Sequence, residues 1–200
     1  MTLPTQAQHE KKPTREQAQK ILLKLWEQNP SIDLAKLYKW FEPTVPAKPK
    51  TAEQWIMKAT AKKDVRYYLQ NLYSTGNTLV ATDGHRLHLC RNLDYSTGYY
   101  DKSLNAIDDE ARYPDFERVI PKDASEPLRL GDITPEPMVH IIKDKPINRV
   151  KIHGTCVDAK YWNDATSGMT PEAMVHLGEP FDAVKIVDDD RIAVIMPVRM

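Results

Sequence analysis

Cysteines and long hydrophobic runs are scarce in this sequence. The two cysteines, Cys90 and Cys156, are far apart, so neither a disulfide framework nor a Cys-x-x-Cys site is expected. No apolar stretch approaches the ~18 residues of a transmembrane helix, and the polar residues 1–12 lack the apolar core of a secretory signal. These absences predict a protein of the reducing cytoplasm without a membrane partner.

An excess of charge of either sign is also missing. Lysine plus arginine and aspartate plus glutamate number 28 each, which gives a formal net charge of zero. Proteins that bind nucleic acid through their overall charge are strongly basic, so the balance argues against that class but leaves a local basic face open. A length of 200 residues allows one domain with an appendage, or at most two small domains.

Prolines and apolar periodicity divide the chain into three parts. Residues 1–13 are polar and are expected to form a disordered tail. Residues 14–42 carry two short apolar stripes at helical spacing, separated by Pro30, which predict a helical hairpin. The three prolines within 43–50 predict extended chain. Because the hairpin is too small to fold alone, residues 43–200 are expected to form the domain.

The predicted domain contains short helices followed by strands, twice. Thr51 and Gln54 form a capping box that opens a helix to residue 63, and Asp83-Gly84 is a hairpin turn. The other helix is expected at 158–166. Strands are expected at 65–73, 78–82, 86–91, 99–104, 138–143, 149–157, 173–177, 183–187 and 191–198. The predicted fold class is therefore α+β.

Three segments that are distant in the sequence carry recognisable motifs. The first reads DVRYYL at 64–69 with VATDGHRL at 80–87, the second YPDFERVIP at 113–121, and the third VIMPVRM at 194–200. They resemble, in this order, the middle domain, the junction of the middle and third domains, and the C-terminal strand of the bacterial beta sliding clamp, the beta subunit of DNA polymerase III. A weaker similarity is DAKY at 158–161.

This resemblance implies a DNA-clamp-like domain, with short helices packed on antiparallel sheets, that is reduced around one site. In the clamp family the matching segments wall the pocket for the clamp-binding peptides of client proteins. The residues carried over to peptide binding are Arg66, Tyr68, Leu69, Thr82, Gly84, His85, Arg86, Leu87, Pro114, Arg118, Val119, Asp158, Tyr161, Val194, Met196, Pro197, Val198, Arg199 and Met200.

The chemistry of these residues fits a peptide with a glutamine and bulky apolar side chains, which is what clamp clients present. An apolar slot is expected from Leu69, Leu87, Val119, Val194 and Met196. Rim donors for peptide carbonyls or an acidic residue are expected from Arg66, His85, Arg86 and Arg199. Asp158, Val198 and Met200 depart from the family, which usually has Asn, Met and Leu there. Asp158 adds negative charge near the glutamine subsite, which puts the client preference in question.

The expected function is that of a non-enzymatic replication accessory protein, a reduced sliding clamp that binds clamp-binding peptides of DNA polymerase or clamp-loader subunits. Such a protein acts as a decoy or as a small accessory clamp, and a phage, prophage or plasmid is a plausible carrier. No catalytic group, metal or cofactor is expected. His85, His88 and Cys90 lack a properly spaced fourth ligand, and the acidic runs at 108–110 and 188–190 are typical of solvated loops.

Two alternatives bind DNA. In the first, copies of the chain associate head to tail into a ring around duplex DNA, with weak phosphate contacts from Lys58, Lys62, Lys63 and Lys160. In that arrangement Lys58 and Lys62 share one helix face. In the second, residues 14–41 act as a helix-turn-helix of a DNA-binding regulator, although the second helix carries only Lys36 and Lys39.

Overall fold

The computed structural model describes Lys24 and residues 51–122, 126–142 and 145–198. The chain divides into two compact units, one of Met1–Thr44 with Ile141–Pro146 and the other of Val45–His140 with Ile147–Met200. Apart from Lys24, the expected tail and hairpin lie outside the described residues. The division into tail, hairpin and domain therefore stays a prediction, and the fold described here is that of the second unit.

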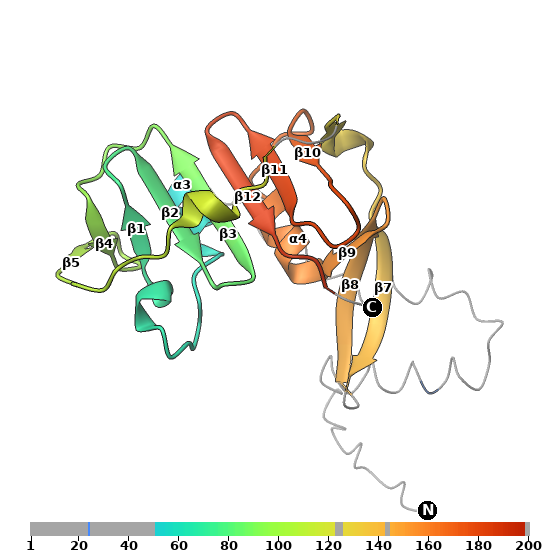
Figure 1. The fold of residues 1–200 in the computed structure, drawn as a ribbon, viewed down its shortest axis with the longest axis horizontal. Coiled ribbons are helices and arrows are strands. Elements are labelled where there is room, and N and C mark those ends of the chain that lie inside the picture. The colour runs from blue at the N-terminus through green and yellow to red at the C-terminus, as the bar shows by residue number, and fades with distance from the viewer. Residues whose placement is uncertain (1–23, 25–50, 123–125, 143–144, 199–200) are drawn as a thin grey trace, which may run out of the picture. The chain divides into compact units, whose positions relative to one another are not determined.

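Among the described residues, nine strands form one antiparallel sheet in the order β5-β4-β1-β2-β3-β12-β11-β10-β6 (Figure 1). Their bounds are β1 (Leu72–Ser74), β2 (Thr78–Thr82), β3 (Arg86–Arg91), β4 (Gly98–Tyr100), β5 (Ala106–Ile107), β6 (Leu128–Arg129), β10 (Met174–His176), β11 (Val184–Asp188) and β12 (Arg191–Ile195). The middle of the sheet is the β3–β12 pair, in which Leu87 lies opposite Val194. The C-terminal strand is therefore an interior strand of the sheet.

A second, three-stranded sheet has the order β7-β8-β9. Its strands are β7 (Glu136–Ile142), β8 (Lys145–Ile152) and β9 (Thr155–Asp158). The single strand predicted at 149–157 is wrong, because β8 and β9 are separated by a turn at His153 and Gly154. Both turn residues have positive φ, 45° and 95°, a conformation that glycine adopts without steric strain.

Two α-helices and three short 3₁₀ helices complete the described structure. They are α3 (Ala52–Met57), α4 (Ala159–Thr166), η1 (Tyr67–Gln70), η2 (Phe116–Val119) and η3 (Leu130–Asp132). Thr51 caps α3 as predicted, since its hydroxyl accepts the N–H of Gln54, but the helix ends at Met57 rather than at residue 63. None of the described helices is long and apolar enough to span a bilayer.

The strand predicted at 65–73 is also wrong, because most of that segment forms η1 and only its end belongs to β1. The Asp64 carboxylate accepts the N–H of Arg66 at 2.8 Å, a local turn that competes with a sheet ladder. The turn brings Leu69 inward, where it is 1% exposed.

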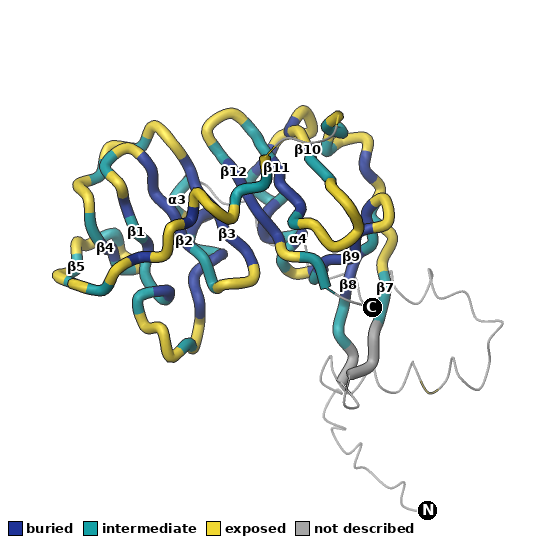
Figure 2. Tube along the Cα trace, viewed as in Figure 1, coloured by how far each residue is buried: buried dark blue, intermediate teal, exposed yellow. Residues whose placement is uncertain are grey.

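Two apolar clusters occupy the two faces of the large sheet, and Figure 2 shows the buried positions gathered along its central strands. One cluster lies under α3 and α4, where the indole N–H of Trp55 donates to the carbonyl of Ala165 at 2.8 Å. The other contains Leu87 and Leu89 of β3. This division confirms the predicted alternation along 86–91 and the α+β fold class, with short helices packed on antiparallel sheets.

Candidate functional site

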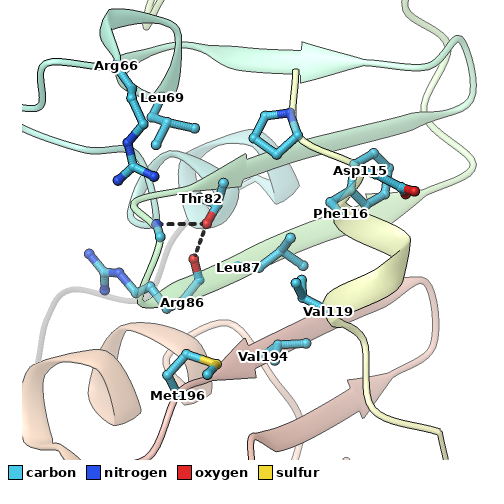
Figure 3. Close-up of a pocket in the computed structure, with 12 residues that line it drawn as sticks. Arg66, Leu69, Thr82, Arg86, Leu87, Asp115, Phe116, Val119, Val194 and Met196 are labelled. Carbon is cyan, nitrogen blue, oxygen red and sulfur yellow. Dashed lines mark hydrogen bonds between the residues drawn. The ribbon is translucent and has the colours of Figure 1, made fainter. Parts of the chain in front are cut away.

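The three motif segments meet at a pocket of about 150 Å³ on the face of the sheet opposite α3 and α4 (Figure 3). We name it the Met196 pocket. Its floor is a row of three directly paired residues, Thr82 on β2, Leu87 on β3 and Val194 on β12. Leu87 and Val194 are each 2% exposed, so the floor is a fixed part of the sheet.

Apolar side chains from three other elements wall the Met196 pocket. Leu69 of η1 closes one side, and Phe116 and Val119 of η2 lie on the other (Figure 3). Met196 follows β12 at the rim. Val119 and Met196 are 53% and 45% exposed, unlike the buried floor. The pocket therefore combines a rigid apolar base with two exposed apolar side chains that can close over a bound group.

A hydrogen-bonded turn between β2 and β3 forms one edge of the pocket. The hydroxyl of Thr82 accepts the N–H of Gly84 at 3.0 Å and donates to the carbonyl of Arg86 at 2.6 Å. The carboxylate of Asp83 accepts the N–H groups of His85 and Arg86 at 3.0 and 3.1 Å. These side chains replace the missing strand partners of the turn, so its backbone is pre-ordered.

The C-terminal segment is joined directly to this turn. The N–H of Met196 donates to the carbonyl of His85 at 2.9 Å, which extends the β3–β12 ladder beyond Ile195. The sequence motif at 194–200 and the Asp-Gly-His-Arg turn are therefore neighbours in space. Arg199 and Met200, at the end of this motif, lie outside the described residues.

Arg66 supplies a cation at the mouth of the pocket. Its guanidinium donates twice to the carboxylate of Asp64, at 3.0 and 2.9 Å, and these bonds lower the pKa of Asp64 to about 2. A Cβ on Gly84, whose φ is +87°, would lie 3.1 Å from Nη2 of Arg66. Glycine at this position thus allows the close approach of the guanidinium to the turn.

Arg86 belongs to the lining of the Met196 pocket, but its guanidinium already has partners within the protein. Strand alternation directs it away from Leu87, and its side chain is 5% exposed on the helix side. It donates to Asp83 at 3.0 Å, to Asp164 at 2.6 Å and to the carbonyl of Lys58, and it lies 4.4 Å over the ring of Tyr161. Arg86 therefore fastens the turn to α3 and α4.

The charge state of Asp164, the acidic partner of Arg86, follows from its burial and its pairing. Burial raises the pKa of the Asp164 carboxyl, but hydrogen bonds from Lys160 and Arg86 outweigh it and hold the pKa below its ordinary value. Asp164 is therefore a buried carboxylate with two cationic partners, one of them 57% exposed.

Most of the remaining carried-over residues do not belong to the lining of the Met196 pocket. Asp158 caps α4 by accepting the N–H groups of Lys160 and Tyr161, a role that asparagine fills equally well. Val198 donates its N–H to the carbonyl of Cys156 at 2.8 Å. The others outside the lining are Tyr68, His85, Arg118, Tyr161 and Pro197, whereas Pro114 belongs to it.

Two lining residues, Asp115 and Phe116, were not among the candidates from the sequence. Both lie inside the motif at 113–121, so the signal was present. The large apolar side chain of Phe116 pointed to burial, and the structure places it 8% exposed in the cluster that contains Leu87.

Two of the four lysines expected to contact DNA have partners within the protein. The ammonium of Lys58 donates to the hydroxyl of Ser167 at 2.7 Å, and Lys160 pairs with Asp164. Lys62 and Lys63 are exposed but follow the end of α3, so Lys62 does not share a helix face with Lys58, contrary to the prediction.

The described residues contain no cluster of three or more His, Cys, Asp or Glu side chains suited to a metal ion. His88 is fully buried and stacks on Trp55 with ring centroids 4.4 Å apart. Burial lowers the pKa of His88 to about 3. Its position identifies it as a neutral part of the core beneath α3.

Comparison with known proteins gives matches to solved structures. No family model matches the sequence, and no curated protein matches it. The beta sliding clamp of C. crescentus is 17% identical with a TM-score of 0.53, over 74% of this chain and 62% of that one. The sliding clamp of Pseudomonas aeruginosa is 18% identical with a TM-score of 0.52, over 74% and 64%. The beta subunit of Thermotoga maritima is 16% identical with a TM-score of 0.51, over 74% and 63%.

The chain thus spans less than two thirds of the length of each of these clamps. At this level of identity the match concerns the fold, and it agrees with the motifs at 64–87, 113–121 and 194–200. The resemblance predicted from the sequence is confirmed at the level of structure: the described part of the chain has the fold of bacterial beta sliding clamps.

Proposed function

We propose that this protein is a non-enzymatic accessory protein of DNA replication that binds clamp-binding peptides of DNA polymerase or clamp-loader subunits in the Met196 pocket. The observation that carries the proposal is the convergence of three distant segments on one apolar pocket, with the Met196 N–H bonded to the His85 carbonyl. The fold similarity to replication clamps supports the same class of partner.

The lining accounts for the kind of peptide that would bind. Full burial of one leucine or phenylalanine side chain contributes ~1.5–3 kcal/mol, so two anchors over Leu87 and Val194 supply a large part of the ~8 kcal/mol of a micromolar complex. Arg66 and the ordered turn at Gly84 offer polar contacts to the peptide backbone. Met196, with its flexible thioether, adapts the rim to different anchors.

The test is a titration of a fluorescently labelled short peptide that contains one glutamine, one leucine and one phenylalanine. Wild-type protein is expected to bind it with micromolar affinity, and Met196→Ala to bind it ~5- to 30-fold more weakly, the range of ~1–2 kcal/mol typical for truncation of a pocket anchor. Met174→Ala is the matched control, since Met174 is also exposed but lies on β10, outside the pocket lining.

Absence of peptide binding by the wild-type protein, or equal losses in the two methionine variants, would remove the proposal. Whether binding assists or antagonises replication then follows from adding the protein to a polymerase reaction with its clamp. A decoy reduces processive synthesis in proportion to its occupancy by the polymerase peptide.

A DNA-encircling ring is the weaker alternative. One clamp-like unit cannot surround duplex DNA, so a ring needs self-association, and two of the four candidate lysines are engaged within the protein. If light scattering shows a monomer, and this monomer does not bind duplex DNA at moderate salt, the ring alternative is excluded. The regulator alternative depends on residues 14–41, and deletion of residues 1–42 without loss of DNA affinity ends it.

A further inference from the structure

A second pocket lies on the same face of the large sheet as the Met196 pocket. Its volume is about 280 Å³, and its lining combines Pro121 and Lys122 with His176, Leu177, Asp182 and Ala183. We name it the His176 pocket. No residue carried over from the sequence resemblance lines it, so the proposed function leaves it unexplained.

The strand register places the two pockets in one line. Five directly paired residues run across β2, β3, β12, β11 and β10: Thr82, Leu87, Val194, Lys185 and His176. The first three form the floor of the Met196 pocket, and the last lines the His176 pocket. The row is thus a straight path across the sheet, and Lys185 is the only step between the pockets.

The length of this path fits a peptide. Neighbouring strands are ~4.8 Å apart, so the two strands from Val194 to His176 separate the pocket floors by about 10 Å. An extended peptide advances ~3.3 Å per residue. Three residues beyond an anchor in the Met196 pocket therefore reach the His176 pocket when the peptide crosses the strands.

One chain segment walls both pockets. Phe116 and Val119 face the Met196 pocket, and Pro121 and Lys122, which follow directly, face the His176 pocket. A peptide that lies along this segment would contact it continuously. The path is therefore bounded on one side by residues 116–122 and below by the row of paired strand residues.

The charges of the His176 pocket indicate what it would hold. Lys122 is exposed and, among the described residues, has no ion-pair partner. Asp182, the acidic residue of the lining, already accepts the N–H of Glu179 at 2.9 Å. Lys185, paired in register with His176, is only 6% exposed and has an interaction within the protein, so Lys122 is the exposed positive charge at this pocket. The apolar part of the lining accommodates the methylene groups of a longer acidic side chain.

We propose that the His176 pocket takes an acidic side chain, glutamate in particular, of the same client peptide, three or four residues from the apolar anchor. This inference rests on the proposed function of the Met196 pocket. It makes Lys122 a specificity-determining residue that favours acidic flanks over neutral ones.

The experiment compares three labelled peptides on full-length protein. The first is the short anchor peptide, and the other two extend it by four residues at the N-terminal or the C-terminal end, with glutamate at the outer two positions. Each acidic peptide has a counterpart with glutamine in place of glutamate. The protein variants are wild type, Lys122→Ala and, as a matched exposed lysine far along the chain, Lys102→Ala.

One of the two acidic extensions is expected to bind about threefold to fivefold more tightly than its glutamine counterpart, the scale of an exposed ion pair. The gain should persist in Lys102→Ala, vanish in Lys122→Ala and shrink as salt is raised. A gain that is absent for both extensions, or that survives Lys122→Ala, overturns the inference.

The outcomes separate the two proposals. If the anchor peptide binds normally to Lys122→Ala and neither extension adds affinity, the Met196 pocket stands and the His176 pocket inference fails. If the anchor peptide does not bind wild-type protein, both fail. Light scattering of wild type and Lys122→Ala completes the test. If the wild-type protein is a dimer and the Lys122→Ala variant is a monomer, the pocket binds a second copy of this chain, and the inference is overturned.

Discussion

Replacement of Asp164 by asparagine should destabilise the protein by about 3 kcal/mol, the lower end of the range for breaking a buried ion pair. The Arg86 guanidinium is 5% exposed and Asp164 7%, so loss of the carboxylate leaves a buried cation. Arg86 keeps Asp83 and the carbonyl of Lys58, which is why the loss should not reach the upper end.

The matched control is Lys160→Ala, which removes the other cation from the same carboxylate. Because Lys160 is 57% exposed, its pair with Asp164 is screened by water, and its removal should change stability by no more than ~1 kcal/mol. Both variants are measured as the free energy of unfolding from urea titrations at neutral pH. Near-equal losses of unfolding free energy in the two variants would refute the conclusion that the buried pair with Arg86 stabilises the fold more than the exposed pair with Lys160.

A double variant sharpens this test. Arg86→Met with Asp164→Leu replaces the pair by apolar side chains and removes the buried guanidinium, while the Asp83 carboxylate, 14% exposed, keeps the backbone N–H groups of residues 85 and 86. It should be more stable than Asp164→Asn alone, because buried ion pairs are often replaced by apolar groups at little cost. Peptide affinity is the second readout, since the turn loses its fastening to α3 and α4 in every variant that lacks Arg86.

Three further perturbations test other parts of the structure. The pKa of His88 falls from 6.5 to about 3 on folding, so the folded state resists protonation and the free energy of unfolding declines as pH drops below 6.5. In urea titrations the decline should reach ~2 kcal/mol at pH 5, and it should be absent in His88→Gln. Gly84→Ala and Gly154→Ala both force alanine into positive φ, and each should lower the free energy of unfolding by ~1–2 kcal/mol. Only Gly84→Ala should also weaken peptide binding, because its Cβ would meet Arg66. Equal peptide affinities of the two variants would contradict the close approach of Arg66 to the turn. Thr82→Val keeps the shape but removes both hydroxyl hydrogen bonds of the turn, and should lower the free energy of unfolding by ~1–2 kcal/mol; an unchanged urea midpoint would show that the hydroxyl does not order the turn.

The central strands could be predicted because their side chains alternate. The alternation places Leu87 and Leu89 on one face of the strand and His88 and Cys90 on the other. Both faces are buried in the structure. The same alternation predicts that the Arg86 side chain points away from Leu87, so its burial on the helix side could have been inferred. What could not be inferred is its partner Asp164, which is separated from it by 78 residues.

The two misassigned strands have local causes. At 64–69 the carboxylate of Asp64 captures the backbone of Arg66, a contact that competes with an apolar pattern that otherwise favours a strand. At 149–157 the sequence pattern predicts one continuous strand, but Gly154 allows the chain to reverse direction in the middle of it. The convergence of the three motifs was available only through the family resemblance, since periodicity does not specify which strands pair.

The interior position of β12 has a consequence for biosynthesis. The strand that pairs with β3 leaves the ribosome long after β3 itself, so the earlier strands remain for that interval with an unpaired edge and an uncovered Leu87. Such edges recruit other chains, and non-local pairings of this kind form slowly. Translational stalling before residue 191 would therefore leave the β3 edge open to pairing with other chains.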